Sequence, residues 1–197
     1  MLINFFGSLH LTTGGLYPFS LLESWNVALF EWLRAAPDAP HLCVQLGKLM
    51  SELPIYLAAV LLLIYLVRHR VGQTGIAFAI ALLSSRLAES LIKAFAYHSR
   101  PFAAGFGPAL LEHAANNSMP SSHATFVWTA ATVMALYRQW KMAGVLAGLG
   151  ILVAWARIYV GIHWPFDMVG SAVVAASCAL IGKGLQPWIR LPRLSRS

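Results

Sequence analysis

The chain has 197 residues, of which 58% are hydrophobic and only 11% are charged, and its formal net charge is +7. A soluble domain contains roughly 25% charged residues, so this composition excludes an ordinary soluble protein. The positive charge does not indicate nucleic-acid binding, because the basic residues lie mostly in short clusters between apolar runs. We therefore expect an all-α, polytopic transmembrane helix bundle that forms one domain over residues 1–197.

The first 50 residues are expected to form an interfacial segment. Residues 1–15 lack a basic region and a small-residue cleavage site, so no cleaved signal peptide is predicted. Residues 20–36 mix large apolar side chains with Glu23, Glu31 and Arg34. Because charges deep in lipid are costly, this stretch is predicted to be an amphipathic helix at the interface. A membrane crossing within residues 1–50 remains an alternative.

Five apolar runs then predict five transmembrane helices, each near the roughly 20 residues that cross a bilayer. They are Leu53–Val67, Gly75–Ala96, His123–Leu136, Met142–Tyr159 and Phe166–Leu185, so that residues 53–188 hold the bundle. Gly144, Gly148 and Gly150 predict close packing of the fourth span against a neighbouring helix.

Basic residues in the loops predict the orientation of these spans. Alternation of the spans places one set on a single side: Arg68, Arg70, Arg138, Lys141, Lys183, Arg190, Arg193 and Arg196. The positive-inside rule assigns that side to the cytoplasm. Residues 97–122 and 160–165 then face the opposite side.

Arg86, Glu89 and Lys93 lie in the second predicted span, roughly along one helical face. Ionisable groups inside a membrane usually pair with each other or face a cavity. A structural ion pair is the simpler interpretation for Arg86 and Glu89, and Lys93 begins a larger pattern.

Three polar clusters lie at the non-cytoplasmic ends of their predicted helices. They are KAFAYHSRP with Lys93 and Arg100, PSSH at residues 120–123, and RIYVGIHWPFD with Arg157, His163 and Asp167. Two arginines and a lysine can bind phosphate oxygens, the arginines through a planar fork. The Ser121 hydroxyl and the backbone N–H groups of Ser122 and His123 lie where a helix begins, a position that favours anions.

Two histidines indicate the chemistry. His163 and Asp167 are brought together either by one helical turn or by a Trp-Pro turn with Asp167 at a helix start. A carboxylate bonded to one imidazole nitrogen makes the other nitrogen a better nucleophile. His123 lies at the anion site, where it can exchange a proton. The pair suits covalent phosphoryl transfer, in which one histidine attacks phosphorus and the other protonates the departing oxygen.

The order and spacing of these clusters resemble the type 2 phosphatidic acid phosphatase superfamily, whose signature is Lys-x6-Arg-Pro, Pro-Ser-x-His and Ser-Arg-x5-His-x3-Asp. The first motif is complete at Lys93, Arg100 and Pro101. The second has Ser122 where glycine is common, and the third has Ala156 where serine is usual.

The resemblance, which spans residues 93–167, implies metal-independent hydrolysis of a lipid phosphate or diphosphate by a six-helix type of bundle without a cofactor. It implies His163 as the nucleophile, His123 as the general acid and Asp167 as the orienting carboxylate. The implied substrate-binding residues are Lys93, Arg100, Ser121, Ser122 and Arg157.

Within that superfamily the chain is most similar to bacterial undecaprenyl-diphosphate phosphatases of the bacitracin-resistance type. The similarity rests on the short chain, the amphipathic N-terminal segment and the stretches EHAANNSMPSSH and WARIYVGIHWPFDMVG. It implies recycling of the carrier lipid for peptidoglycan synthesis, at the outer face of the bacterial cytoplasmic membrane. The partners would be a polyprenyl diphosphate or another phosphorylated lipid, and the membrane lipids.

Several alternatives stay open from the sequence. The substrate can also be phosphatidylglycerophosphate or a lipid A phosphate, and a phosphotransferase would use the same site with a lipid acceptor. A non-catalytic binder or transporter is disfavoured, because His123 and His163 are both present and no internal repeat is visible. His98 and His113 are interpreted as either substrate contacts or solvated loop residues, and Glu112 as a residue that could repel a diphosphate or order it through water. The sequence does not determine the oligomeric state.

Overall fold

The computed structural model describes residues 18–69 and 72–189. Within them the helices are α1 (Pro18–Leu33), α2 (His41–Arg68), α3 (Gly72–Phe95), α4 (Ser122–Leu136), α5 (Trp140–Tyr159) and α6 (Pro165–Leu185), followed by a short 3₁₀ helix, η1 (Gln186–Trp188). The described residues contain no strand, so the expected all-α fold is confirmed. Residues 1–15, Arg70, Arg190, Arg193 and Arg196 lie outside the described part of the chain.

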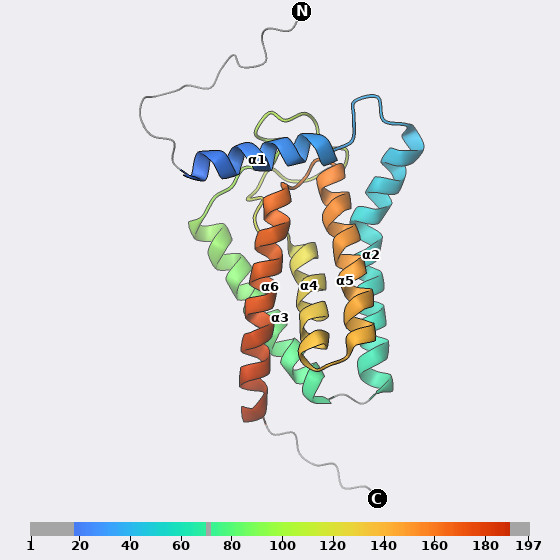
Figure 1. Cartoon of the computed structure of the whole chain (residues 1–197), viewed down its shortest axis with the longest axis vertical. Coiled ribbons are helices and arrows are strands. Elements are labelled where there is room, and N and C mark those ends of the chain that lie inside the picture. Colours follow the sequence, from blue (N-terminus) through green and yellow to red (C-terminus); the bar gives the residue numbers. More distant parts are fainter. Residues whose placement is uncertain (1–17, 70–71, 190–197) are drawn as a thin grey trace, which may run out of the picture.

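Helices α2 to α6 form a bundle along the long axis, in which α3 runs obliquely, and α1 lies across one end of it (Figure 1). The middle of the bundle is α4, whose buried side chains are mostly small or branched and let its neighbours approach closely. Ala130 and Met134 of α4 pack with Ala58 of α2 and Leu146 of α5 in one apolar cluster. The arrangement is the expected polytopic bundle.

The number of helices that can cross a membrane differs from the expected five. Four are long and apolar enough, namely α2, α3, α5 and the segment Pro165–Trp188 that contains α6. Helix α4 has 15 residues, so its axis is about 22 Å long, shorter than the hydrocarbon core of roughly 30 Å. The predicted span His123–Leu136 is therefore a short helix enclosed by the others.

In the N-terminal region, the boundary between the interfacial segment and the first membrane helix also differs from the prediction. Helix α2 begins at His41 rather than Leu53, because Lys48 and Glu52 interrupt the apolar run without interrupting the helix. The interfacial segment therefore ends before residue 41. Helix α1 agrees with the predicted interfacial helix, since Trp25 and Trp32 on it are largely exposed.

The three polar clusters converge on the end of the bundle that α1 covers (Figure 1). Helix α3 ends there, α4 begins there, and the turn from α5 to α6 lies there, together with the long segment that joins α3 to α4. The described members of the basic set lie toward the opposite end: Arg68, Arg138, Lys141 and Lys183. The predicted convergence on one end is thus present in the fold.

Glycines bring some helices into close contact, although two of those expected to do so do not. Gly150 of α5 faces the Trp128 ring of α4, where an added Cβ would lie 3.2 Å from the nearest atom. Gly144 and Gly148 have no described atom within 4 Å of such a Cβ, so that prediction is wrong for this pair. The closest approach, which the sequence analysis did not identify, lies at Gly182 of α6 against α3.

Candidate active site

The turn between α5 and α6 brings His163 and Asp167 together. His163 precedes the helix, Trp164 is its N-cap residue, and Asp167 lies in its first turn. The Trp164 backbone N–H donates to Asp167 Oδ2 at 2.8 Å, and His163 Nδ1 lies 3.3 Å from the same oxygen. Of the two arrangements left open by the sequence, the Trp-Pro turn with Asp167 at the helix start is therefore the one observed.

The contacts of His163 define its tautomer. Nη1 of Arg100 lies 3.1 Å from His163 Nε2, and a guanidinium can only donate, so Nε2 carries the lone pair. Nδ1 then carries the proton and donates it to Asp167. Burial lowers the pKa of His163 to about 3, with the positive charges of Arg157 and Arg100 acting in the same direction. The imidazole is thus neutral at physiological pH, with the nitrogen on the side of Arg100 available for attack.

Asp167 has two further side-chain partners that the sequence analysis did not assign to the site. The Ser118 hydroxyl donates to Asp167 Oδ2, and His98 Nδ1 lies 3.1 Å from Asp167 Oδ1. The hydrogen bond to Asp167 raises the pKa of His98. Both residues come from the segment between α3 and α4, whose path no local sequence pattern predicts.

Arg100 is buried and held entirely by protein groups. Its Nη1 also donates to the carbonyl oxygen of Ile162 at 2.8 Å, and its Nε and Nη2 donate to Asn116 Oδ1 at 3.0 and 2.9 Å. Burial lowers its pKa to about 10, and the positive charge of Arg157 contributes. Arg100 is thus held in place against His163 Nε2.

A second cluster joins His123 to Arg157 through Glu52 of α2. Glu52 Oε1 accepts from Arg157 Nη1 at 3.1 Å, and Glu52 Oε2 lies 3.1 Å from His123 Nε2. Glu52 lies outside the three sequence clusters and was not among the predicted site residues. A carboxylate directly before an apolar run was the available signal, because such a group inside a helix bundle needs a partner.

The start of α4 has the polar groups that an anion site requires. Ser121 occupies the N-cap position but makes no side-chain capping bond. Among the described residues, Ser121 Oγ and Arg157 Nε are buried without a hydrogen-bond partner. Buried polar atoms are normally paired, and a phosphate oxygen at this helix N-terminus would satisfy such donors.

A third group of side chains lies between α3 and α4. Ser122 Oγ accepts from Lys93 Nζ at 3.1 Å and donates to Glu89 Oε2 at 2.7 Å. The same Glu89 oxygen pairs with Arg86 Nη1 at 3.1 Å and lies 4.0 Å from Lys93 Nζ. The expected Arg86–Glu89 ion pair is therefore present, and it is linked to the PSSH segment through Ser122.

The remaining loop residues differ in their positions. His113 Nε2 lies 3.5 Å from Arg157 Nη2, its ring centroid is 6.3 Å from that of His163, and burial lowers its pKa. Glu112 is exposed and has no hydrogen bond or ion pair within the described part of the chain. His98 and His113 therefore lie in the site, whereas Glu112 has no contact that places it there. Over the described ranges, no three His, Cys, Asp or Glu side chains are grouped as metal ligands.

Sequence comparison relates the chain to known proteins. The profile of the PAP2 superfamily matches residues 74–190, which include all three clusters. The chain is 35% identical over 156 residues to YbjG of Escherichia coli K12, a candidate undecaprenyl-diphosphatase, with 77% of each chain covered. It is 34% identical over 119 residues to the undecaprenyl-diphosphatase BcrC of Bacillus subtilis, which covers 60% of this chain and 61% of the relative. An undecaprenyl-diphosphatase of Sulfolobus acidocaldarius is 31% identical over 153 residues, or 75% of this chain and 71% of the relative.

Two solved structures share the fold. LpxE of Aquifex aeolicus superposes with a TM-score of 0.68 at 23% identity, covering 80% of this chain and 94% of that one. A PAP2-type phosphatidylglycerolphosphate phosphatase of Bacillus subtilis gives a TM-score of 0.60 at 16% identity, covering 88% and 89%. At these identities the likeness concerns the fold alone.

Proposed function

The chain belongs to the PAP2 superfamily of membrane phosphatases, and from this premise we propose that it hydrolyses undecaprenyl diphosphate to undecaprenyl phosphate and inorganic phosphate. The observation that carries the proposal is the state of His163, whose Nδ1 faces Asp167 and whose unprotonated Nε2 faces an arginine. The choice of lipid is supported by the relatives at 31–35% identity that are named undecaprenyl-diphosphatases.

In the first step of the proposed mechanism, His163 Nε2 attacks the terminal phosphorus. Arg100 stays in place and donates the Nη1 N–H that faced Nε2 to a phosphate oxygen, and Arg157, Lys93 and the Ser121 hydroxyl bind the same group. The bond between phosphorus and the bridging oxygen breaks, and the electron pair stays on that oxygen. His123 gives its proton to the bridging oxygen, so that undecaprenyl phosphate leaves and a phosphohistidine remains.

In the second step, water hydrolyses the phosphohistidine. His123, now neutral, accepts a proton from the water as the oxygen attacks phosphorus. The phosphorus–nitrogen bond breaks, inorganic phosphate is released, and the electron pair returns to His163 Nε2. Asp167 holds the Nδ1 proton throughout, which keeps the ring in the reactive tautomer.

We place the site at the outer face of the bacterial cytoplasmic membrane, where the carrier lipid would be recycled. The described basic residues at the opposite end of the bundle support this orientation. The whole chain then acts as one membrane-embedded phosphatase domain, since residues that approach the site come from α2, α3, α4 and the α5–α6 turn.

The test is phosphate release by the purified protein in detergent, with EDTA present to remove metal ions. Undecaprenyl diphosphate, phosphatidylglycerophosphate and lipid A are compared, and His163→Ala and His123→Ala are assayed beside the wild type. We expect release mainly from the diphosphate and none with His163→Ala. Brief reaction with substrate labelled in the terminal phosphate should leave acid-labile label on the wild type.

The His123→Ala variant separates the two histidines. It should slow both steps yet keep the label site, whereas His163→Ala should never be labelled. Substantial turnover by His163→Ala contradicts the mechanism. Preferential release from phosphatidylglycerophosphate or lipid A contradicts the substrate, and transfer of label to an added lipid in place of water identifies a phosphotransferase.

A further inference from the structure

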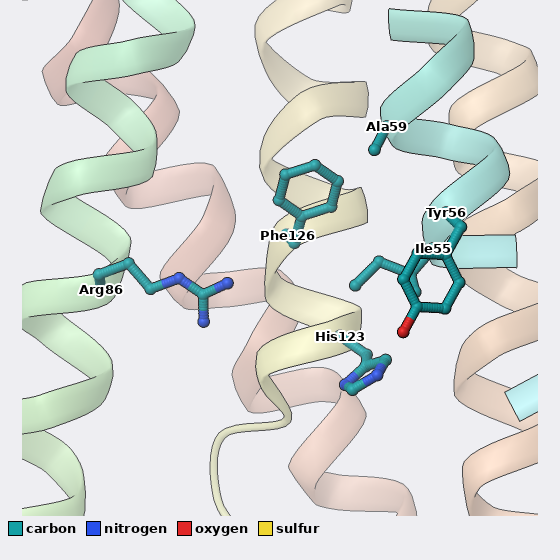
Figure 2. Close-up of a pocket in the computed structure, with 6 residues that line it drawn as sticks. All are labelled: Ile55, Tyr56, Ala59, Arg86, His123 and Phe126. Atoms are coloured by element: carbon teal, nitrogen blue, oxygen red, sulfur yellow. The ribbon is translucent and has the colours of Figure 1, made fainter. Parts of the chain in front are cut away.

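A pocket of about 270 Å³ lies between α2, α3 and α4, beside the phosphate-binding groups. Its lining residues are Ile55, Tyr56, Ala59, Arg86, His123 and Phe126 (Figure 2). His123 belongs both to this pocket and to the cluster with Glu52 and Arg157. The general acid therefore lies at the boundary between the charged site and a largely apolar space.

Arg86 is the cation of this pocket, and much of its hydrogen-bonding capacity is unused. Its Nη1 donates to Glu89, and no other hydrogen bond of its guanidinium is found within residues 18–69 and 72–189. The side chain is 50% exposed, and it reaches from α3 toward α4 (Figure 2). A half-exposed guanidinium within a membrane helix is costly, and such groups usually serve a function.

The charges around Arg86 favour an anion. Glu89 is paired with Arg86 at 3.1 Å and with Lys93 at 4.0 Å, and it also accepts a hydrogen bond from Ser122. One carboxylate thus faces two cations, and Glu52, which contacts the pocket residue His123, is paired with Arg157, so three cations share two carboxylates. The ion pair explains why Glu89 is tolerated in the helix, but it leaves the remaining guanidinium N–H groups of Arg86 without a partner in the described part of the chain.

We propose that Arg86 binds the lipid-linked phosphate of a lipid diphosphate, the group that departs with the hydrocarbon chain. This inference rests on the proposed function. While the terminal phosphate lies against His163, the bridging oxygen lies at His123 and the second phosphate extends into the pocket. Arg86 binds its non-bridging oxygens through the planar fork, and Ile55, Ala59 and Phe126 contact the first carbons of the chain.

The binding site makes Arg86 a specificity-determining residue. When a diphosphate is cleaved, the leaving group is a phosphate monoester, which remains an anion after His123 has protonated its bridging oxygen. When a lipid monophosphate is cleaved, the leaving group is an alcohol, which offers Arg86 no anion. Arg86 therefore stabilises the transition state for diphosphates far more than that for monophosphates.

Farnesyl diphosphate and farnesyl monophosphate, which share one hydrocarbon chain, provide the test. The value of kcat/KM for the diphosphate is divided by that for the monophosphate, and this ratio is measured for the wild type, for Arg86→Gln and for Arg86→Lys. We expect Arg86→Gln to lower the ratio roughly tenfold to hundredfold, as the loss of a charged hydrogen-bond donor does. Arg86→Lys, which keeps the charge but not the fork, should give an intermediate ratio.

Arg68→Gln is the matched control, because Arg68 is an exposed arginine at the opposite end of the bundle. Its ratio should equal that of the wild type. If Arg86→Gln and Arg86→Lys lose activity equally on both substrates, Arg86 has only a structural role and the inference is overturned. Failure of the wild type to cleave any lipid diphosphate overturns the proposed function, whereas an unchanged ratio in an active Arg86→Gln variant overturns this inference alone.

Discussion

Asp167 receives four hydrogen-bonding groups, from His98, Ser118, His163 and the Trp164 backbone. So many partners fix the plane of the carboxylate, and through it the ring of His163. The sequence predicted the bond to His163, because a spacing of four residues across a Trp-Pro turn is a local property. The bonds from His98 and Ser118 depend on how a long loop folds back, which the sequence pattern does not contain.

The buried side chain of His163 makes the stability of the protein depend on pH. The pKa of His163 is about 3 in the folded protein and near 6.5 in an unfolded chain. As the pH falls below 6.5, the unfolded chain takes up a proton that the folded protein refuses, so the free energy of unfolding decreases toward pH 3. We expect His163→Gln, which cannot be protonated, to lose less thermal stability than the wild type between pH 7 and pH 4.5.

His98 provides the control of opposite sign. Its pKa is raised, so its contribution is fully present below the unfolded value of 6.5 and is lost as the pH rises through the folded value. His98→Gln should therefore lose the stabilisation that the wild type gains on mild acidification. Thermal unfolding in detergent, followed by tryptophan fluorescence at several pH values, measures the stability of the wild type and of both variants. Parallel plots of melting temperature against pH for the three proteins would contradict the two pKa shifts.

Glu52 couples two groups of the proposed reaction, since it contacts both Arg157 and His123. Replacing it by glutamine removes the charge and leaves Arg157 buried without an ionic partner. We expect Glu52→Gln to lower turnover of the lipid diphosphate roughly tenfold to hundredfold. Glu31→Gln on the exposed face of α1 is the same change away from the site and should have the turnover of the wild type. Equal turnover in the two variants would show that Glu52 does not contribute.

At the scale of the elements, the apolar runs predicted each long helix, because burial and lipid both select the same residues. Two predictions were wrong, the residue at which α2 begins and the membrane crossing by α4, and each has a physical reason. Glu52, near the start of the apolar run, is paired with Arg157 and His123 inside the fold, so α2 already includes residues where the apolar pattern has not begun. Helix α4 is apolar because protein surrounds it, and apolarity alone does not distinguish that environment from lipid.

The contact between α3 and α6 should be sensitive to a single methyl group. A Cβ at Gly182 would overlap the Ala77 carbonyl oxygen and lie 3.0 Å from the Ala81 Cβ, and a backbone carbonyl cannot move aside. Gly182→Ala should therefore cost about 1–3 kcal/mol of stability. Gly184→Ala, where no described atom lies within 4 Å, should be neutral or slightly stabilising. Thermal unfolding of the two variants measures the difference, and equal melting temperatures would contradict the close approach.

At the scale of the whole molecule, the alternation of spans predicted that the three clusters share one end. That prediction holds although α4 is too short to cross a membrane, because α4 still runs in the expected direction, with its first residues toward the end that carries the other two clusters. The grouping of Glu52 with His123 and Arg157 was not predictable in this way. It requires α2 to lie next to both α4 and α5, which only packing determines.

The proposed orientation predicts which side of the membrane reaches Cys43. This cysteine is exposed near the start of α2, at the end that carries the site, whereas Cys178 is buried in α6. A membrane-impermeant maleimide added to intact cells should label Cys43 if that end faces outward. In Cys43→Ser with Lys141→Cys, at the opposite end, labelling should require permeabilised cells. The reverse pattern would invert the orientation.

The shortness of α4 also limits which molecules can be processed. Its first residues bind the phosphate in the proposed mechanism, and they lie below the neighbouring ends of α5 and α6, with α1 lying across that end of the bundle (Figure 1). The phosphates of a bound substrate would therefore lie within the bundle, beneath α1. A diphosphate head group without further substituents is small enough to fit there, but a carrier lipid that still bears its sugars would have to place them against α1. The enzyme would then spare loaded carriers and act only on those that have delivered their cargo.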